Sequence, residues 1–230
     1  MRCPWQCGCE IAVGKLEQGT TALDVDFYFG VGSRYSYLAS TQLAALGSET
    51  GARFNWLSVD SAQLIAAAHS GHSPFAAPNG PGQYDWGYRQ KDAEAWAALY
   101  GVPFREPHDR LALDPNLLSL ACTAARRLGV AEAYARVLFR TVFADDLPAV
   151  DRDMCIARAG DVGLDRDAFA RTLDDAGTRE ERERVTQKAV KWGAFGVPTF
   201  AVNGRLFWGN DRLVLLRHTL LQARAGKREA

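Results

Sequence analysis

The sequence lacks both an excess of charge and a long apolar run. Lys and Arg total 27 of the 230 residues, and so do Asp and Glu, so the net charge is zero. That balance excludes the basic footprint typical of a nucleic-acid-binding protein. No apolar run approaches the roughly 18 residues of a membrane-spanning helix, and the N-terminal residues contain no hydrophobic stretch typical of a secretory signal. We therefore expect a cytoplasmic protein with neither a nucleic-acid nor a membrane partner.

Cysteine is also scarce, since the chain has five, an odd number that at this length does not form a disulfide framework. Cys122 and Cys155 stand in apolar, helix-like surroundings, where a thiol usually behaves as a small hydrophobic group. Cys3, Cys7 and Cys9 are clustered, but a closed zinc site needs four ligands and no fourth lies nearby. We predict no metal site and interpret residues 1–23 as a tail outside the fold.

The first folded unit is predicted to be a strand, a helix and a second strand. Residues 25–31 are rich in β-branched and aromatic side chains and end near glycine. A run with apolar residues at helical spacing follows over 34–46, and apolar residues alternate over 52–57. Because the connection is short, this order predicts a right-handed βαβ unit with parallel strands.

Residues 60–177 are predicted to form an inserted helical domain. A Gly- and Pro-rich loop occupies 71–82, and an amphipathic helix over 85–100 ends before Gly101. Asp114 followed by Pro115 predicts the capped start of another helix. Further helices fit residues 131–144, 151–159 and 166–174.

The C-terminal part is predicted to complete the fold with a helix, a hairpin and a last helix. Thr178 and Glu181 have the spacing of a capping box, which predicts a helix start at Thr178. Asn203-Gly204 predicts a two-residue hairpin between short strands. The whole order, βαβ, helical insertion, αββα, is that of an α/β thioredoxin-like fold, with its two parts at 24–59 and 178–230.

The loop after the first strand is the place to look for chemistry in such a fold. It leads into a helix N-terminus, whose free N–H groups and positive dipole end favour an anion or a thiolate. A disulfide oxidoreductase has Cys-x-x-Cys there, whereas this chain has Gly30-Val31-Gly32-Ser33. Dithiol exchange is therefore excluded at this loop. A serine can still donate a hydrogen bond to a thiolate supplied by another molecule, such as glutathione.

Three segments of the chain stand out together. They are the opening Asp26-Phe27-Tyr28-Phe29 with Ser33-Arg34-Tyr35-Ser36-Tyr37-Leu38-Ala39, the middle Trp96 with Leu99-Tyr100-Gly101-Val102-Pro103, and the closing Phe195-Gly196-Val197-Pro198-Thr199-Phe200 with Trp208-Gly209-Asn210-Asp211-Arg212-Leu213. These segments resemble the 2-hydroxychromene-2-carboxylate isomerase family, which belongs to the kappa-class glutathione transferase and DsbA-like branch of thioredoxin folds. The resemblance spans roughly residues 24–222, and the three segments stand in the family's order.

The resemblance implies a glutathione site with a role for each of five residues. Ser33 matches the serine that hydrogen-bonds the glutathione sulfur and holds it as a thiolate. Pro198 matches a cis-proline, which implies that the Val197 backbone pairs with the cysteinyl part of glutathione. Asn210 and Asp211 match positions that bind the γ-glutamyl end.

For the substrate, the resemblance implies contacts from Asn79 in the Gly/Pro loop and from Tyr88. Arg34 stands where the family commonly has proline after the serine, and Gly30 stands where it commonly has an acidic residue shortly before the serine. Arg34 thus adds a cation, which either favours an anionic substrate or faces solvent. The tryptophans, Trp86 among them, are interpreted as packing residues.

The activity that the resemblance implies is glutathione-dependent cis–trans isomerisation of a conjugated aromatic ring-cleavage product similar to 2-hydroxychromene-2-carboxylate. The thiolate adds to a conjugated double bond, the resulting single bond rotates, and elimination returns the thiol. The resemblance also implies a homodimer. Two alternatives stay open, a kappa-like glutathione transferase and a non-catalytic thioredoxin-like binding protein. A disulfide oxidoreductase that uses Cys3, Cys7 and Cys9 is a more distant one.

Overall fold

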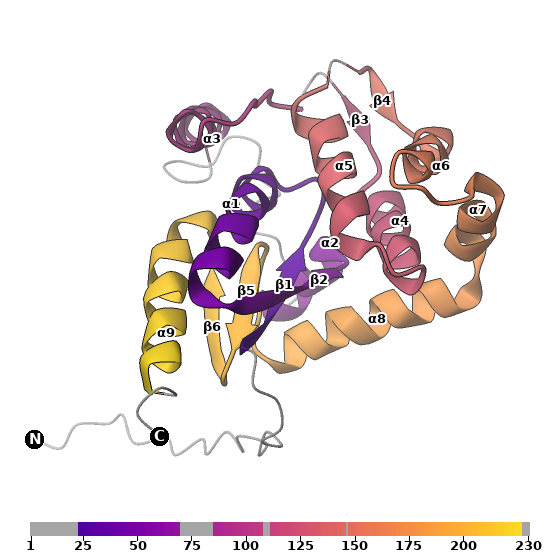
Figure 1. The fold of residues 1–230 in the computed structure, drawn as a ribbon. Helices are drawn as coiled ribbons and strands as arrows, with labels where there is room; N and C mark the ends of the chain where they lie inside the picture. Colours follow the sequence, from indigo (N-terminus) through magenta and orange to yellow (C-terminus); the bar gives the residue numbers. More distant parts are fainter. Residues whose placement is uncertain (1–22, 70–84, 108–110, 146, 227–230) are drawn as a thin grey trace, which may run out of the picture.

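The computed structural model describes residues 23–69, 85–107, 111–145 and 147–226 (Figure 1). A βαβ unit opens the fold, with β1 (Leu23–Phe29), α1 (Arg34–Thr50) and β2 (Ala52–Ser58). The fold closes with β5 (Thr199–Val202), β6 (Arg205–Trp208), the 3-10 turn η2 (Asn210–Arg212) and α9 (Leu213–Gly226). No described helix combines the length and the apolar character needed to cross a bilayer.

The segment between β2 and β5 is mostly helical, as predicted. Its helices are α2 (Ser61–Ala68), α3 (Trp86–Tyr100), α4 (Pro115–Arg127), α5 (Ala131–Phe143), α6 (Arg152–Gly160), α7 (Arg166–Asp174) and α8 (Ala176–Lys191). It also contains a small parallel ladder of β3 (Ala112–Leu113) and β4 (Ala149–Val150), which is too short to show an alternating pattern in the sequence. The division of this segment from the sheet as a separate domain stays a prediction.

The central sheet has the strand order β2-β1-β5-β6. β1 runs parallel to β2, with Phe27 opposite Trp56, and antiparallel to β5, with Phe27 opposite Phe200. β5 and β6 are antiparallel neighbours joined by Asn203-Gly204, whose φ values are 48° and 75°. Positive φ at both central residues defines the hairpin turn that favours Asn-Gly. The α/β thioredoxin-like fold with a helical insertion is confirmed.

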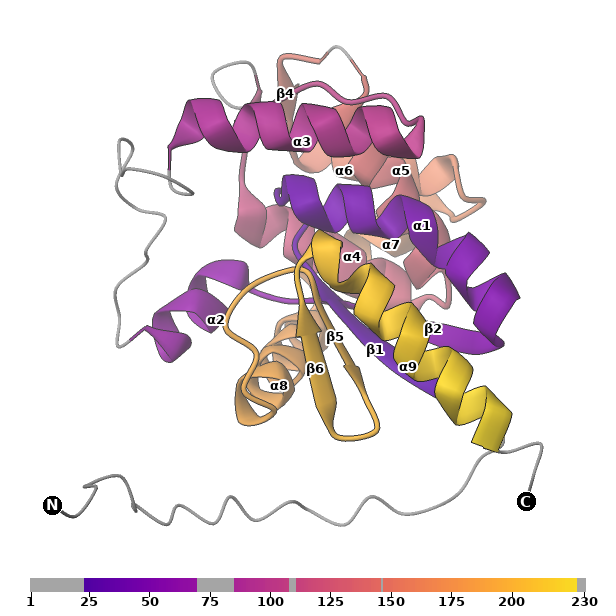
Figure 2. The ribbon, with the colours of Figure 1, turned by 90° about the vertical axis from the view of Figure 1, so that its left-hand side faces the viewer.

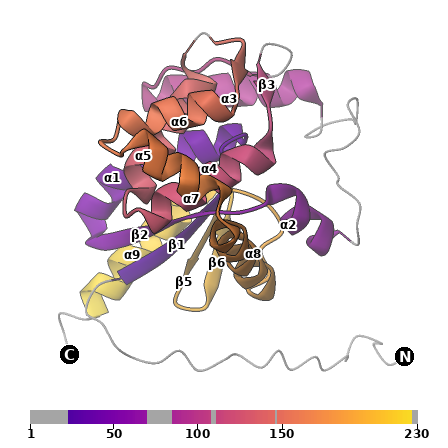
Figure 3. The ribbon, with the colours of Figure 1, turned by 90° about the vertical axis from the view of Figure 1, so that its right-hand side faces the viewer.

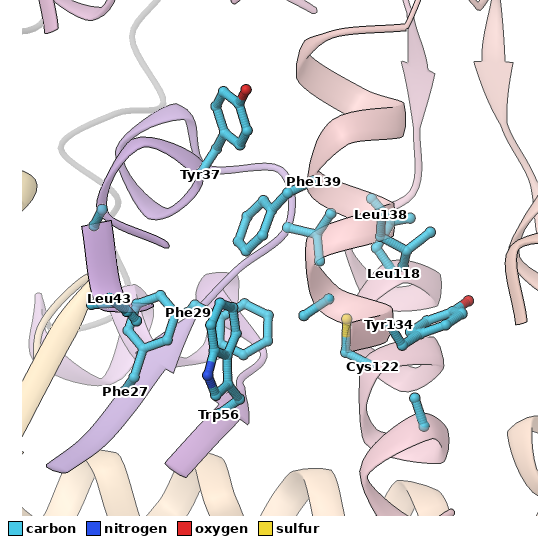
Figure 4. Close-up of a cluster of buried hydrophobic side chains, with 14 of the residues drawn as sticks. Phe27, Phe29, Tyr37, Leu43, Trp56, Leu118, Cys122, Tyr134, Leu138 and Phe139 are labelled. Carbon is cyan, nitrogen blue, oxygen red and sulfur yellow. The ribbon is translucent and has the colours of Figure 1, made fainter. Parts of the chain in front are cut away.

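Aromatic side chains dominate one face of the sheet and join it to the inserted helices. The Phe27 ring lies 5.0 Å from the rings of both Trp56 and Phe200, measured between centroids. Phe29 lies 5.5 Å from Phe139 of α5, so β1 contacts the insertion directly (Figure 4). Such contacts add to the burial of large apolar surfaces. The sheet and the inserted helices therefore share one hydrophobic cluster.

The two faces of the sheet are covered by different helices. Figure 2 shows α1 and α9 in front of the strands, and Figure 3, from the opposite side, shows α8 in front of β6. Because side chains alternate along a strand, Tyr28 points away from Phe27 and Phe29. It packs in a second cluster with Leu64 of α2 and Ala189 of α8. The fold is thus three layers, with helices on both sides of the sheet.

The start of α8 differs from the prediction. The helix begins at Ala176 and its N-cap is Asp175, whose carboxylate accepts a hydrogen bond from the Gly177 N–H (2.8 Å). The capping box predicted at Thr178 is wrong, because the Thr178 hydroxyl is buried and donates to the Thr172 carbonyl (2.5 Å). Glu181 forms an ion pair with Arg126 instead. Asp is at least as good a cap as Thr. With Asp175 as the cap, Thr178 is the third residue of the helix and is buried.

Leu38 and Leu99 provide a matched test of the shared core. Leu38 on α1 is fully buried, whereas Leu99 on α3 is 72% exposed. We expect Leu38→Ala to lower the free energy of unfolding by about 2–5 kcal/mol, because it removes apolar contacts and leaves a cavity. Leu99→Ala should change it by less than about 0.5 kcal/mol. Denaturant unfolding measures both, and equal losses would contradict this description of the core.

Candidate functional site

One cavity of about 580 Å³ lies where the N-terminus of α1 meets the loop before β5 and the turn after β6. Residues of α3 line it as well, and Figure 2 shows α3 lying along α1. Its volume falls within the roughly 300–1,000 Å³ of small-molecule sites. The residues that line it include Ser33, Arg34, Tyr35, Trp86, Tyr88, Arg89, Asp92, Trp96, Gly196, Val197, Pro198, Trp208, Gly209, Asn210 and Asp211.

Ser33 is the N-cap of α1. Its Oγ accepts a hydrogen bond from the Ser36 N–H (3.2 Å), and its own N–H donates to the Gly30 carbonyl (3.0 Å). A hydroxyl has two lone pairs and one proton, so the capping bond leaves the Ser33 proton for another acceptor. The first N–H groups of a helix have no acceptor within it. The cavity therefore receives a hydroxyl donor at the positive end of a 17-residue helix.

The loop before β5 forms the wall next to Ser33. The Val197–Pro198 peptide bond is cis, which confirms the prediction at Pro198. The Pro198 carbonyl accepts a hydrogen bond from the Gly209 N–H (2.9 Å), which ties this loop to the turn after β6. Gly196 lies so close to the Trp208 side chain that a Cβ at this position would fall 2.7 Å from the indole nitrogen. This close approach explains why glycine occupies that position.

Asn210 and Asp211 begin the turn η2, directly after Gly209. Asn210 is only 2% exposed, and its Oδ1 accepts a hydrogen bond from the Tyr100 hydroxyl (3.1 Å). Its Nδ2 has no hydrogen-bond partner among the residues that the structure describes. The Asp211 carboxylate is half exposed and pairs with Arg212 (3.1 Å). Together they offer an amide donor and an anionic acceptor to the cavity.

Arg34 is buried rather than solvent-facing, so the solvent-facing alternative is wrong. Its guanidinium lies 2.9 Å from the Glu106 carboxylate and 4.8 Å from the centre of the Trp86 ring. Burial is the largest influence on the Arg34 pKa and lowers it, whereas Glu106 opposes that change and Arg89 adds to it. The cation at the start of α1 is therefore partly compensated by a buried carboxylate.

A second contact joins α1 to α3 beside the cavity. The Tyr35 hydroxyl donates to the Asp92 carboxylate (2.7 Å). Burial, followed by this hydrogen bond, raises the pKa of Tyr35. The phenol therefore stays protonated at neutral pH and the link to α3 persists.

The outer wall of the cavity is aromatic, and the sequence predicts only one of its residues, Tyr88. Trp86 and Trp96 are expected from the sequence to be packing residues, yet both line the cavity. Tyr88 is 56% exposed and lies at the rim, and the Arg89 guanidinium lies 4.8 Å from the centre of the Trp86 ring. The position of Trp86 directly after the Gly/Pro loop was the available sequence clue.

The structure brings most of the predicted site residues into this one cavity, although their roles stay predictions. Those that line it are Ser33, Arg34, Tyr88, Val197, Pro198, Asn210 and Asp211. Asn79 lies outside the described residues. Its predicted contact with the substrate stays a prediction.

The cysteines of the described part, Cys122 and Cys155, are buried and do not line the cavity. Burial is the main reason that the pKa of Cys122 is raised well above its ordinary value and that of Cys155 to about 12. Such thiols stay protonated at neutral pH and are poor nucleophiles. Cys3, Cys7 and Cys9 lie outside the described residues. Within the described ranges, no group of three His, Cys, Asp or Glu residues is arranged to hold a metal ion.

Comparison with known proteins places the chain in a family. The DSBA-like thioredoxin domain matches residues 24–221. A 2-hydroxychromene-2-carboxylate isomerase of Sphingobium xenophagum is 32% identical over 198 residues, which cover 86% of this chain and 97% of that protein. The chain belongs to the 2-hydroxychromene-2-carboxylate isomerase family of DSBA-like thioredoxin proteins. The isomerase of the same name from Pseudomonas putida is 31% identical, with 85% of this chain and 93% of that protein covered.

A solved structure of a 2-hydroxychromene-2-carboxylate isomerase has the same fold. It superposes with a TM-score of 0.76 at 28% identity and covers 90% of this chain and all of the other. In this chain, all three segments that resemble the isomerase family line the same cavity, through Ser33, Trp96 and Pro198 among other residues. The family resemblance read from the sequence is confirmed.

The buried Arg34–Glu106 pair leads to a prediction about stability. The two side chains are 7% and 10% exposed. Removing one partner of a buried pair leaves the other charge uncompensated, so we expect Glu106→Gln or Arg34→Met to cost about 3–5 kcal/mol of unfolding free energy. The double variant should cost clearly less than the sum of the singles. Denaturant unfolding of the four proteins checks this, and additive losses would show that the two groups do not compensate each other.

Proposed function

We propose that the protein is a glutathione-dependent isomerase that interconverts the cis and trans forms of a conjugated aromatic ring-cleavage product similar to 2-hydroxychromene-2-carboxylate. The observation that carries this proposal is the cavity itself. There a serine hydroxyl at a helix N-terminus, and not a cysteine, faces the Val197–Pro198 loop and the Asn210–Asp211 turn. The relatives named 2-hydroxychromene-2-carboxylate isomerase support the same reaction.

The residues present fit glutathione. This tripeptide carries carboxylates, an ammonium group, amides and a thiol, and the cavity offers a group suited to each kind. Asn210 Nδ2 is a buried donor without a partner among the described residues, and Asp211 is an exposed carboxylate for a cation. Val197 and Pro198 line the same cavity, and the family resemblance implies that the Val197 backbone pairs with the cysteinyl part of glutathione.

When bound, glutathione supplies the thiolate that adds to the substrate's conjugated double bond and later leaves, so that rotation exchanges the cis and trans forms. Ser33 favours the ionised form of that sulfur by donating its hydroxyl proton as a hydrogen bond. The positive end of α1 stabilises the same charge. Because Ser33 Oγ is held by the Ser36 N–H (3.2 Å), the donor is positioned before the reaction begins.

The aromatic wall suits the substrate half of the reaction. Trp86, Tyr88 and Trp96 offer ring surfaces for a flat conjugated molecule. Arg34 and Arg89 bring positive charge to the same wall through their contacts with Trp86. This combination favours an aromatic acid over a neutral aromatic compound. The wall also reduces contact of the reacting double bond with water.

The test is isomerisation of 2-hydroxychromene-2-carboxylate with glutathione in less than stoichiometric amount. We expect many turnovers per glutathione with the thiol concentration unchanged, as followed by absorbance and a thiol assay. Ser33→Ala should lower kcat on the order of 10²-fold, the loss typical of one hydrogen-bond donor to a developing charge. Consumption of one thiol per product would indicate a transferase, and no dependence on glutathione would refute the proposal.

The control for this test is Asp165→Ala. Asp165 is the N-cap of α7 and accepts a hydrogen bond from the Ala168 N–H (2.8 Å). It does not line the cavity. Both variants lose a cap worth about 1 kcal/mol, so equal losses of activity would show that Ser33 acts only through stability.

A further inference from the structure

The Asn210 side chain is a buried amide with one end occupied. It is 2% exposed and lines the cavity, and its Oδ1 accepts a hydrogen bond from the Tyr100 hydroxyl (3.1 Å). Its Nδ2 has no partner among the residues that the structure describes. A buried donor without an acceptor is costly to keep, and such a group in a cavity wall points to a ligand acceptor.

Tyr100 reaches Asn210 from a distant part of the chain. It is the last residue of α3, and its ring lies 5.5 Å from that of Trp96, which lines the cavity. Burial is the largest influence on the Tyr100 pKa and raises it. The hydrogen bond with Asn210 acts against this rise and Asp211 adds to it. The phenol therefore keeps its proton at neutral pH, and the geometry directs that proton to Asn210 Oδ1.

The direction of this hydrogen bond decides what Asn210 offers to the cavity. An amide side chain has an acceptor oxygen on one side and two donor hydrogens on the other. When the Tyr100 hydroxyl donates to Oδ1, Nδ2 is left for the ligand. Without that hydroxyl, the amide can turn so that Oδ1 faces the ligand. Oδ1 would then repel a ligand oxygen, because both atoms carry partial negative charge.

We propose that Tyr100 is a positioning residue that fixes the Asn210 amide with Nδ2 available to a carboxylate or carbonyl oxygen of the ligand. This inference rests on the proposed use of glutathione. Tyr100 itself does not line the cavity. It acts through Asn210 and joins the inserted helix α3 to the glutathione half of the site.

A double-mutant cycle tests the coupling. Calorimetric titration with glutathione should show about five- to tenfold weaker binding for Tyr100→Phe and for Asn210→Ala, the effect of one hydrogen bond. In the double variant, the loss of the Tyr100 hydroxyl should cost nothing beyond Asn210→Ala. A Tyr100→Phe penalty that persists in full in the Asn210→Ala background would overturn the proposal.

Two controls separate positioning from general damage. Tyr37→Phe removes another tyrosine hydroxyl bond, from Tyr37 to the Pro103 carbonyl (2.5 Å), away from the cavity lining, and should leave glutathione affinity unchanged. Ophthalmic acid, in which a methyl group replaces the glutathione thiol, should show the same Tyr100→Phe penalty as glutathione. A penalty confined to glutathione would assign the effect to the thiol and overturn the proposal.

A spectroscopic measurement tests the geometry without any ligand. The side-chain amide signal of Asn210, identified by its loss in Asn210→Ala, should shift in Tyr100→Phe and stay unchanged in Tyr37→Phe. An unchanged signal in Tyr100→Phe would overturn the proposal. If the wild type does not bind glutathione at all, the proposed function fails, and this amide signal alone then decides the role of Tyr100.

Discussion

The contact between Phe27 of β1 and Phe200 of β5 determines where the site lies. Their rings stack with centroids 5.0 Å apart, and the two residues are opposite each other in the antiparallel pair. This register sets Tyr28 opposite Thr199. The chain therefore leaves β1 toward Ser33 at the same edge of the sheet where Pro198 enters β5. A core contact on one face of the sheet thus aligns the two loops that carry the proposed glutathione contacts.

The insertion completes the cavity that the sheet begins. α3 is joined to α1 through Tyr35 and Asp92 (2.7 Å) and to η2 through Tyr100 and Asn210 (3.1 Å). The first bond ends at Tyr35, close to the proposed thiolate site at Ser33. The second ends at Asn210, in the proposed γ-glutamyl site. One inserted helix therefore supplies the aromatic wall and also orients groups on the thioredoxin-like part.

The features that could be predicted from sequence are local ones. The Asn203-Gly204 turn and the Asp114 cap depend on backbone preferences of a few residues, and both are as predicted. Ser33 is indicated by its place between the first strand and the N-terminus of the next helix, and Pro198 by the resemblance of a short segment. The predicted start of α8 is wrong because Asp175 and Thr178 are both good N-cap residues. The contacts of Thr178 with Arg127 and Thr172 decide between them.

Contacts between distant segments could not be predicted in this way. The burial of Arg34 depends on Glu106 and Trp86, which come from other elements. The Tyr100–Asn210 hydrogen bond joins residues 110 positions apart. No periodicity or motif within one segment contains that information, because only tertiary packing brings the segments together.

Proton release on glutathione binding tests the central claim most directly. A free thiol has a pKa of about 8.5, so at pH 7 a site that stabilises the thiolate must release a proton when glutathione binds. Calorimetric titrations in buffers of different ionisation enthalpy measure the number of protons released per glutathione bound. We expect release of close to one proton by the wild type and clearly fewer by Ser33→Ala. Saturable binding without proton release, or no binding, would contradict the claim that this serine site holds a thiolate.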